Sequence, residues 1–328
     1  MMKTSAFERH PKLTIASLLA FGALLVLGAA ELAARVIGLG QPIIYHAHPI
    51  YGYRPEPNQL VSRNNNLIQI NNLSLRANQN WDLGNPERKI LFLGDSVTYG
   101  GSYIANDELF SHLAVKPFAN YLSGNAGVNG WGIDNVSALI KDMQFLPADI
   151  YISTFPEGDF YRGLMRIGGQ PFWSKKPRFA LEELFQYFVY KLHLNKTPPV
   201  YFYTLSQEEK CRIAELAVLH LKELDDYLKT NHRSHIIFIS PSRSQVLGMS
   251  GVDPCLEQCF ARHNLRVIYI NDKLPKMSDQ ERSQWFHDEI HLSILGHQKW
   301  AQVISTELTK VITPQDNEHE YSISSSAS

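Results

Sequence analysis

Three residue types near opposite ends of the chain have the chemistry of nucleophilic catalysis. Ser96 follows Gly94-Asp95 at the end of an apolar stretch, and Asp288 precedes His291 by three residues. A serine hydroxyl is a weak nucleophile until a histidine accepts its proton and a carboxylate orients that histidine. We therefore expect Ser96, His291 and Asp288 to meet in one catalytic triad.

The segments around these residues indicate how they would be positioned. Residues 89–93 read Lys-Ile-Leu-Phe-Leu and predict a buried parallel strand. Its carboxyl end is where open α/β sheets bind ligands. Residues three apart in a helical turn share one face, so Asp288 and His291 are expected to touch directly. Singly, a Gly-Asp-Ser turn and a surface histidine beside an aspartate are ordinary structural features, but their combination and order favour catalysis.

The chain resembles the SGNH hydrolase superfamily, also called GDSL esterases and lipases, over roughly residues 88–310. The resemblance is carried by three blocks of sequence: Gly94-Asp95-Ser96-Val97-Thr98-Tyr99-Gly100, Asn125-Ala126-Gly127-Val128-Asn129-Gly130-Trp131-Gly132, and Asp288-Glu289-Ile290-His291-Leu292-Ser293 followed by Gly296-His297.

This resemblance implies a fold and a set of residue roles. The expected fold is a three-layer α/β/α domain with a mainly parallel, flavodoxin-like sheet. Ser96 would be the nucleophile, His291 the base and Asp288 its partner. The backbone N–H groups of Ser96 and Gly127 would hold the oxyanion, and neither a metal ion nor an organic cofactor would be needed.

One block departs from the family pattern at an oxyanion position. After the strand expected at residues 149–155 the family carries an Asn-Asp pair, whose Asn donates to the oxyanion, whereas this chain has Gly158-Asp159. Losing one such donor lowers turnover by about 10²–10³-fold. Asn129 is a candidate replacement. Asp159 and Asp95 are expected to support the site by holding the turn of the first block.

The overall composition is that of a globular protein. At 328 residues the chain is long enough for one domain with additions. A net charge of −1 gives no electrostatic basis for binding nucleic acid. Cys211 is isolated and is expected to be a small buried apolar residue. Cys255 and Cys259 are four apart, which is awkward for a disulfide within a helix, and no Cys/His spacing indicates zinc.

The amino terminus is expected to anchor the chain in a membrane. Residues 13–30 contain no charged side chain, and about 20 apolar residues span a bilayer. The basic residues before them predict a cytoplasmic amino terminus (residues 1–12) and an exported remainder. A signal peptide cleaved near Gly28-Ala29-Ala30 is the alternative. The long apolar run, which continues as a helix past Glu31, favours an uncleaved anchor over residues 13–37.

The rest of the chain divides into three parts. Residues 38–87 form a Pro- and Asn-rich lead segment, which resembles the tether before some membrane-anchored bacterial family members; a packed edge hairpin is the alternative. Residues 88–312 form the hydrolase-like domain, and the small or polar residues of 313–328 indicate a disordered tail. Within the domain we expect strands at 89–93, near 125, at 149–155, 235–240 and 265–270, and helices at 133–146, 205–230 and 293–311.

Between residues 160 and 203 the chain is unusually aromatic and basic. Because this insertion follows the third block, it is a candidate lid or subsite wall. Aromatic faces suit sugar rings or acyl chains, and cations suit anionic polymers or lipid headgroups. The alternatives are a helical hairpin that buries its rings in its own core and a contact with the membrane surface.

These features predict a single-pass protein of the bacterial inner membrane, with a serine esterase domain in the periplasm or outside the cell. The resemblance and the anchor favour removal of short acyl groups, such as acetyl esters on an envelope or secreted glycan. A glycan O-acyltransferase with the same triad is one alternative, because both reactions share the acyl-enzyme. A non-catalytic glycan-binding or scaffold subunit is the other; Gly158 favours it, and the retained triad argues against it.

Overall fold

The structure, a computed structural model, describes residues 9–82, 84, 87–142, 148–167, 172–192 and 206–325. Its centre is a parallel sheet of five strands in the order β6-β5-β7-β8-β9. The strands are β5 (Arg88–Gly94), β6 (Tyr121–Asn125), β7 (Ile150–Pro156), β8 (Ser234–Ser240) and β9 (Ile268–Tyr269). The predicted parallel α/β sheet is therefore confirmed, with each expected strand present.

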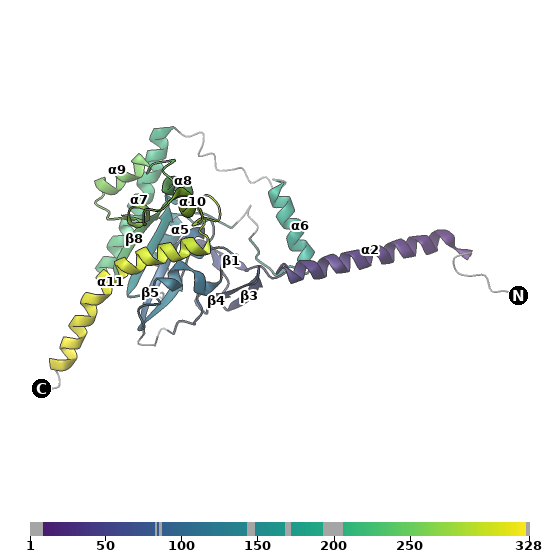
Figure 1. Cartoon of the computed structure of the whole chain (residues 1–328), viewed down its shortest axis with the longest axis horizontal. Helices are drawn as coiled ribbons and strands as arrows, with labels where there is room; N and C mark the ends of the chain where they lie inside the picture. The colour runs from purple at the N-terminus through teal and green to yellow at the C-terminus, as the bar shows by residue number, and fades with distance from the viewer. Residues whose placement is uncertain are drawn as a thin grey trace.

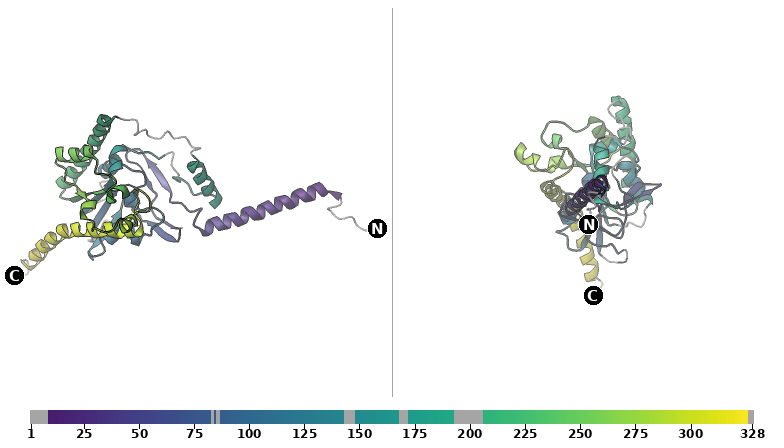
Figure 2. Two further views of the ribbon diagram at one scale, coloured as in Figure 1. Left: turned by 45° about the horizontal axis from the view of Figure 1, so that its top comes forward. Right: turned by 90° about the vertical axis from the view of Figure 1, so that its right-hand side faces the viewer.

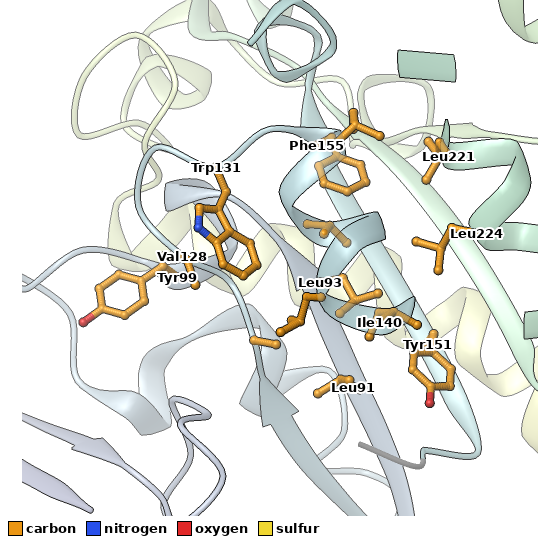
Figure 3. Close-up of a cluster of buried hydrophobic side chains, with 14 of the residues drawn as sticks. Leu91, Leu93, Tyr99, Val128, Trp131, Ile140, Tyr151, Phe155, Leu221 and Leu224 are labelled. Carbon is orange, nitrogen blue, oxygen red and sulfur yellow. The ribbon is translucent and has the colours of Figure 1, made fainter. Parts of the chain in front are cut away.

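Helices cover both faces of this sheet, giving three layers (Figure 1). Alternate residues of β5 point to opposite faces: Leu91 and Leu93 into one core, Ile90 and Phe92 into the other. The first core is closed by α5 (Ile133–Asp142), α7 (Gln207–Thr230) and α9 (Pro254–Arg262), the second by α4 (Phe110–Leu113) and α11 (Ile294–Ser325). Figure 3 shows the first core, where Leu221 and Leu224 from α7 face the sheet.

Short helices fill the connections between these elements. They are α3 (Ser96–Tyr99), η1 (Asn106–Glu108), η2 (Glu157–Tyr161), α8 (Arg243–Val246), η4 (Ile270–Lys273) and α10 (Asp279–Ser283). The expected helices at 133–146, 205–230 and 293–311 correspond to α5, α7 and α11, although residues 143–147 and 205 lie outside the described part. Where a disordered tail was expected from 313, α11 continues to Ser325, because a helix already nucleated by packing propagates readily.

The lead segment is folded against the domain as two antiparallel hairpins. They consist of β1 (Tyr45–His48) with β2 (Gly52–Pro55), and β3 (Gln59–Arg63) with β4 (Asn66–Ile70). Tyr53, Ile68 and Trp81 are buried in the first core. The N–H of Arg76 donates to the Asn125 carbonyl at 2.8 Å and joins the segment to edge strand β6. The packed-hairpin alternative is therefore correct, and the tether is not.

Two further helices lie on the amino-terminal side of the molecule. The apolar helix α2 (Pro11–Val36) extends away from the domain, and it is the one helix of the described residues long and apolar enough to cross a membrane (Figure 1). Helix α6 (Ala180–Lys191) belongs to the aromatic insertion and begins beside the domain end of α2 (Figure 2). The N–H groups of Ala180 and Leu181 donate to the Glu31 carboxylate at 2.9 and 3.0 Å.

A disulfide joins Cys211 and Cys255, whose Cα atoms are 5.1 Å apart. It links the amino-terminal parts of α7 and α9. The expectation that Cys211 is an unpaired apolar residue is therefore wrong, and Cys259 is the buried free thiol instead. The spacing gave no warning, because the partners are 44 residues apart and meet only through the packing of α7 on α9.

Candidate active site

The turn that carries Ser96 is set by two neighbours. A side chain on Gly94 would overlap Thr98 Oγ1 and the Thr154 carbonyl oxygen, so only glycine lets β5 pass this closely into α3. Asp95 is the N-cap of α3, and its Oδ1 accepts the Val97 N–H at 2.8 Å. Ser96 therefore stands at the first helical position, at the carboxyl end of a central strand.

The structure brings Ser96, His291 and Asp288 together in one chain of hydrogen bonds. Ser96 Oγ lies 2.9 Å from His291 Nε2, and His291 Nδ1 lies 2.7 Å from Asp288 Oδ2. Asp288 Oδ1 accepts the backbone N–H groups of Ile290 at 2.9 Å and His291 at 2.8 Å. An ionised carboxylate can only accept a hydrogen bond, so the ring proton of His291 lies on Nδ1. Nε2 is then left to accept the proton of the serine hydroxyl.

The charge of Asp288 is favoured by its surroundings. Burial alone would raise the pKa of Asp288, but the hydrogen bonds from the His291 N–H, the His291 ring and the Ile290 N–H together hold it below its usual value. The side chain of Asp288 is 50% exposed and that of His291 is 29% exposed. The base is thus oriented by an ionised carboxylate in a site that water can reach.

The loop that carries Asp288 and His291 is braced by main-chain hydrogen bonds. The expected helical turn is not formed, since α10 ends at Ser283 and α11 begins at Ile294. Instead the His287 N–H donates to the His291 carbonyl at 2.7 Å, closing the loop on itself. Local main-chain hydrogen bonds within the loop therefore do what a helical turn was expected to do.

Two buried carboxyl groups and one guanidinium support the nucleophile turn. Asp95 and Asp159 are fully buried, and Arg162 Nη1 lies 3.3 Å from Asp95 Oδ2 and 2.7 Å from Asp159 Oδ1. Ser96 Oγ is 3.2 Å from the same Asp95 Oδ2. Burial first, and then the charge of Asp95, raise the pKa of Asp159 well above its usual value. Arg162 therefore compensates both buried carboxyl groups, and its contact with Asp159 is the shorter one.

The two N–H groups expected at the oxyanion, those of Ser96 and Gly127, differ in their hydrogen bonding. Among the described residues none accepts a hydrogen bond from the Ser96 N–H, so that donor is available. The Gly127 N–H instead donates to Asn125 Oδ1 at 2.9 Å, because asparagine side chains readily close on the N–H two residues later. Asn129 lines the same cavity as Ser96, and its Nδ2 donates to Tyr45 Oη at 3.3 Å, which leaves a second amide hydrogen.

Gly158 lies at the edge of the site. A side chain there would meet nothing within 4 Å. It borders a second hollow, beside Pro156 and Ser240, which shares Ile290 with the cavity above Ser96. The space beside residue 158, where the family pattern would place an asparagine side chain, is thus open.

A cavity of about 620 Å³ opens above Ser96 and His291. Its walls come from the lead segment, the domain and the insertion, and they include Ile43, Tyr45, Arg63, Arg162, Trp173 and Tyr190. The insertion therefore walls the candidate site. The alternative of a hairpin with its own aromatic core is wrong for the described part, since Phe185 and Phe188 on α6 are 68% and 54% exposed; residues 168–171 and 193–203 of the insertion lie outside that part.

Arg76 supports the site and was not found by sequence reasoning. It is 3% exposed, its Nη1 donates to the carbonyls of Tyr99 at 2.7 Å and Gly101 at 2.6 Å, and its Nη2 donates to that of Ile104. These contacts fix the chain that follows the nucleophile. His297 is also buried, and its Nδ1 accepts the Phe110 N–H at 3.1 Å. Nothing in the pattern around Arg76 indicates its role.

The described residues contain no group of three or more His, Cys, Asp or Glu side chains placed to hold a metal ion. No protein-family model matches the sequence. No curated protein matches it either.

Solved structures of lipolytic proteins are similar to part of the chain. One is a member of the lipolytic G-D-S-L family from Veillonella parvula, with 14% identity and a TM-score of 0.40, over 68% of this chain and 98% of that one. A lipase/acylhydrolase from Enterococcus faecalis has 14% identity and a TM-score of 0.39, over 68% and 96%. A catalytic mutant of Axe2, an acetylxylan esterase from Geobacillus stearothermophilus, has 17% identity and a TM-score of 0.39, over 68% and 94%. Similarity at this level does not establish an activity.

Proposed function

We propose that the chain is a serine ester hydrolase of the SGNH kind. The observation that carries this proposal is the unbroken path of hydrogen bonds from Ser96 Oγ through His291 to Asp288, at 2.9 and 2.7 Å. Such a path activates a serine hydroxyl at neutral pH. It stands beside a cavity large enough for an acylated ligand.

In the proposed reaction Ser96 Oγ attacks the ester carbonyl carbon while His291 Nε2 takes the hydroxyl proton. The carbonyl electrons move to the oxygen, which the Ser96 N–H and the Asn129 side chain stabilise. The tetrahedral intermediate collapses, and the departing alcohol takes the proton from His291. A water molecule, deprotonated by His291, then attacks the acyl-enzyme and releases the acid and the free serine.

The substrate we propose is a short acyl ester, such as an acetyl group on an envelope or secreted glycan. The cavity offers Trp173 and Tyr190 as aromatic side chains and Gln186 as a polar partner. Export across a bacterial inner membrane, with α2 as the anchor, is part of the proposal. The Cys211–Cys255 disulfide supports it, because disulfides persist mainly outside the cytoplasm.

The exposure of the triad favours hydrolysis over acyl transfer. A transferase with the same residues must keep water from the acyl-enzyme, whereas the Asp288 side chain is 50% exposed. The non-catalytic alternative is disfavoured, because a binding subunit has no use for a serine hydroxyl held within hydrogen-bond distance of an imidazole nitrogen.

Turnover of p-nitrophenyl acetate by the full chain in detergent tests the proposal. We expect Ser96→Ala to lose turnover by at least about 10³-fold. Ser62→Ala, at an exposed position of β3, serves as the matched control and should behave as the native chain. Equal rates for the native chain and Ser96→Ala, or no turnover by the native chain with p-nitrophenyl esters of several lengths, would overturn the assignment.

A further inference from the structure

Helix α6 has two opposite faces with different surroundings. At about 100° per residue, one face carries Leu181, Phe185 and Phe188, followed by the C-cap Leu192, and the other carries Glu183, Gln186, Tyr187 and Tyr190. The second face lines the cavity above Ser96. On the first face Phe185, Phe188 and Leu192 are 68%, 54% and 65% exposed. The helix is therefore a wall of the candidate site whose outer side is apolar and uncovered.

The inner face of α6 is fastened to the lead segment. Arg63 Nη1 lies 2.5 Å from Glu183 Oε1, and the Gly40 N–H donates to Glu183 Oε2 at 2.7 Å. The Glu183 side chain is 8% exposed. This buried pairing holds the apolar outer face in a fixed orientation, turned away from the cavity.

The start of α6 is fixed to α2 at a defined position along the axis of α2. Glu31, which accepts the first N–H groups of α6, is the first charged residue after the uncharged residues 13–30. Eighteen residues at 1.5 Å each span about 27 Å, close to the thickness of a hydrocarbon core. Arg35 Nη2 also donates to the Arg178 carbonyl at 3.4 Å. With α2 across a membrane, α6 thus begins where hydrocarbon gives way to headgroups.

The direction of α6 completes the geometry. It leaves α2 at a steep angle in two views of the molecule, so it runs along the membrane surface when α2 crosses the membrane (Figures 1 and 2). Exposed basic side chains flank it at Lys175, Lys176, Arg178 and Lys191. An apolar aromatic face flanked by Lys and Arg is typical of helices that lie in the interface of an anionic membrane.

We propose that the outer face of α6 lies in the headgroup region of the membrane that α2 spans, and that the cavity takes esters carried by membrane-anchored lipids. This inference rests on the proposed anchor and on the proposed esterase. Because one helix forms both the cavity wall and the membrane contact, an ester held at the bilayer surface lies next to the nucleophile's cavity. The substrate class is therefore an acyl ester on a lipid or lipid-linked carrier.

Depth-dependent quenching in the full chain tests the membrane contact. Phe185→Cys and Phe188→Cys would be labelled with an environment-sensitive fluorophore in phosphatidylcholine–phosphatidylglycerol nanodiscs, with doxyl-labelled lipid as quencher. Leu216→Cys, 54% exposed on α7 and away from α2, is the control. We expect quenching at both α6 positions to exceed the control by about threefold or more. Quenching equal to the control would overturn the contact and leave a protein partner as the occupant of this face.

Kinetics in the same nanodiscs test the substrate class. The double variant Phe185→Ser/Phe188→Ser should lower turnover of hexadecyl acetate, held in the bilayer, by about tenfold. It should leave turnover of water-soluble p-nitrophenyl acetate unchanged, because neither side chain lines the cavity. Equal effects on both esters would overturn the lipid-carried substrate. Quenching without turnover of either ester by the native chain would overturn the esterase while upholding the membrane contact.

Discussion

Replacing Arg162 by Met tests how the nucleophile turn is stabilised. The guanidinium lies between Asp95 and Asp159, both fully buried, at 3.3 and 2.7 Å. Removing one partner of a buried ion pair typically costs 3–5 kcal/mol, because the other charge is left uncompensated. Arg162 itself is 26% exposed, so water compensates part of the loss. We therefore expect the free energy of unfolding to fall by about 3 kcal/mol.

The two carboxyl groups should respond differently. Burial and the charge of Asp95 raise the pKa of Asp159, so ionisation of this group is costly and a neutral amide at position 159 removes that cost. Asp159→Asn should therefore cost less than about 1 kcal/mol. Asparagine at position 95 can still cap α3. Adding Asp95→Asn to the Arg162→Met variant should therefore recover most of the stability that Arg162→Met loses.

Urea unfolding of the full chain in detergent, followed by circular dichroism, measures these differences. Arg166→Met is the matched control, because this arginine is exposed and its Nη1 donates to the carbonyls of His48 and Pro49, at 3.2 and 2.5 Å. It should change stability by less than about 0.5 kcal/mol. If Arg162→Met matches this control, or if Asp159→Asn costs as much as Arg162→Met, the compensation of Asp95 by Arg162 is refuted.

Three further predictions concern the base, a buried histidine and the disulfide. Asp288→Asn should lower the kcat for p-nitrophenyl acetate by about 10⁴-fold; a loss below about tenfold contradicts an orienting carboxylate. Burial lowers the pKa of His297 to about 3, below the value of about 6.5 in an unfolded chain. Protons therefore bind the unfolded chain preferentially, and stability should fall as pH drops from about 6.5 towards 3. His297→Gln should flatten this slope in urea titrations, and an unchanged slope argues against burial of a neutral ring. Cys211→Ser should cost about 2–4 kcal/mol, and unfolding midpoints unaffected by reductant contradict the crosslink.

The parts of the site that the sequence predicted depend on residues that are close together in the chain. Ser96 follows a run of apolar residues that can only be a buried strand, and the strand-end turn fixes its surroundings within a few residues. Asp288 and His291 were paired correctly, although by a braced loop and not by a helical turn. A short spacing limits two side chains to a small region, whatever backbone connects them.

The parts that sequence missed depend on distant contacts. Arg76 reaches carbonyls more than 20 residues away, and Cys211 meets a cysteine 44 residues away. The Gly127 N–H was assigned to the oxyanion, but the neighbouring Asn125 side chain takes it. The sequence left a membrane contact of the insertion as one of three alternatives, because an amphipathic pattern does not say whether its apolar side meets a core or a membrane.

The folded lead segment sets how the site can search for substrate. A flexible tether of about 50 residues would have an end-to-end distance of about 40 Å. It would let the domain move through the space within that distance of the anchor. Here Tyr53, Ile68 and Trp81 are buried within the domain, so the serine is held at one height above the anchor. With α2 across a membrane and the ester on a lipid carrier, as proposed, encounters with substrate occur by lateral diffusion in two dimensions. The rate should follow the surface density of substrate in the membrane, and dilution of the surrounding solution should leave it unchanged.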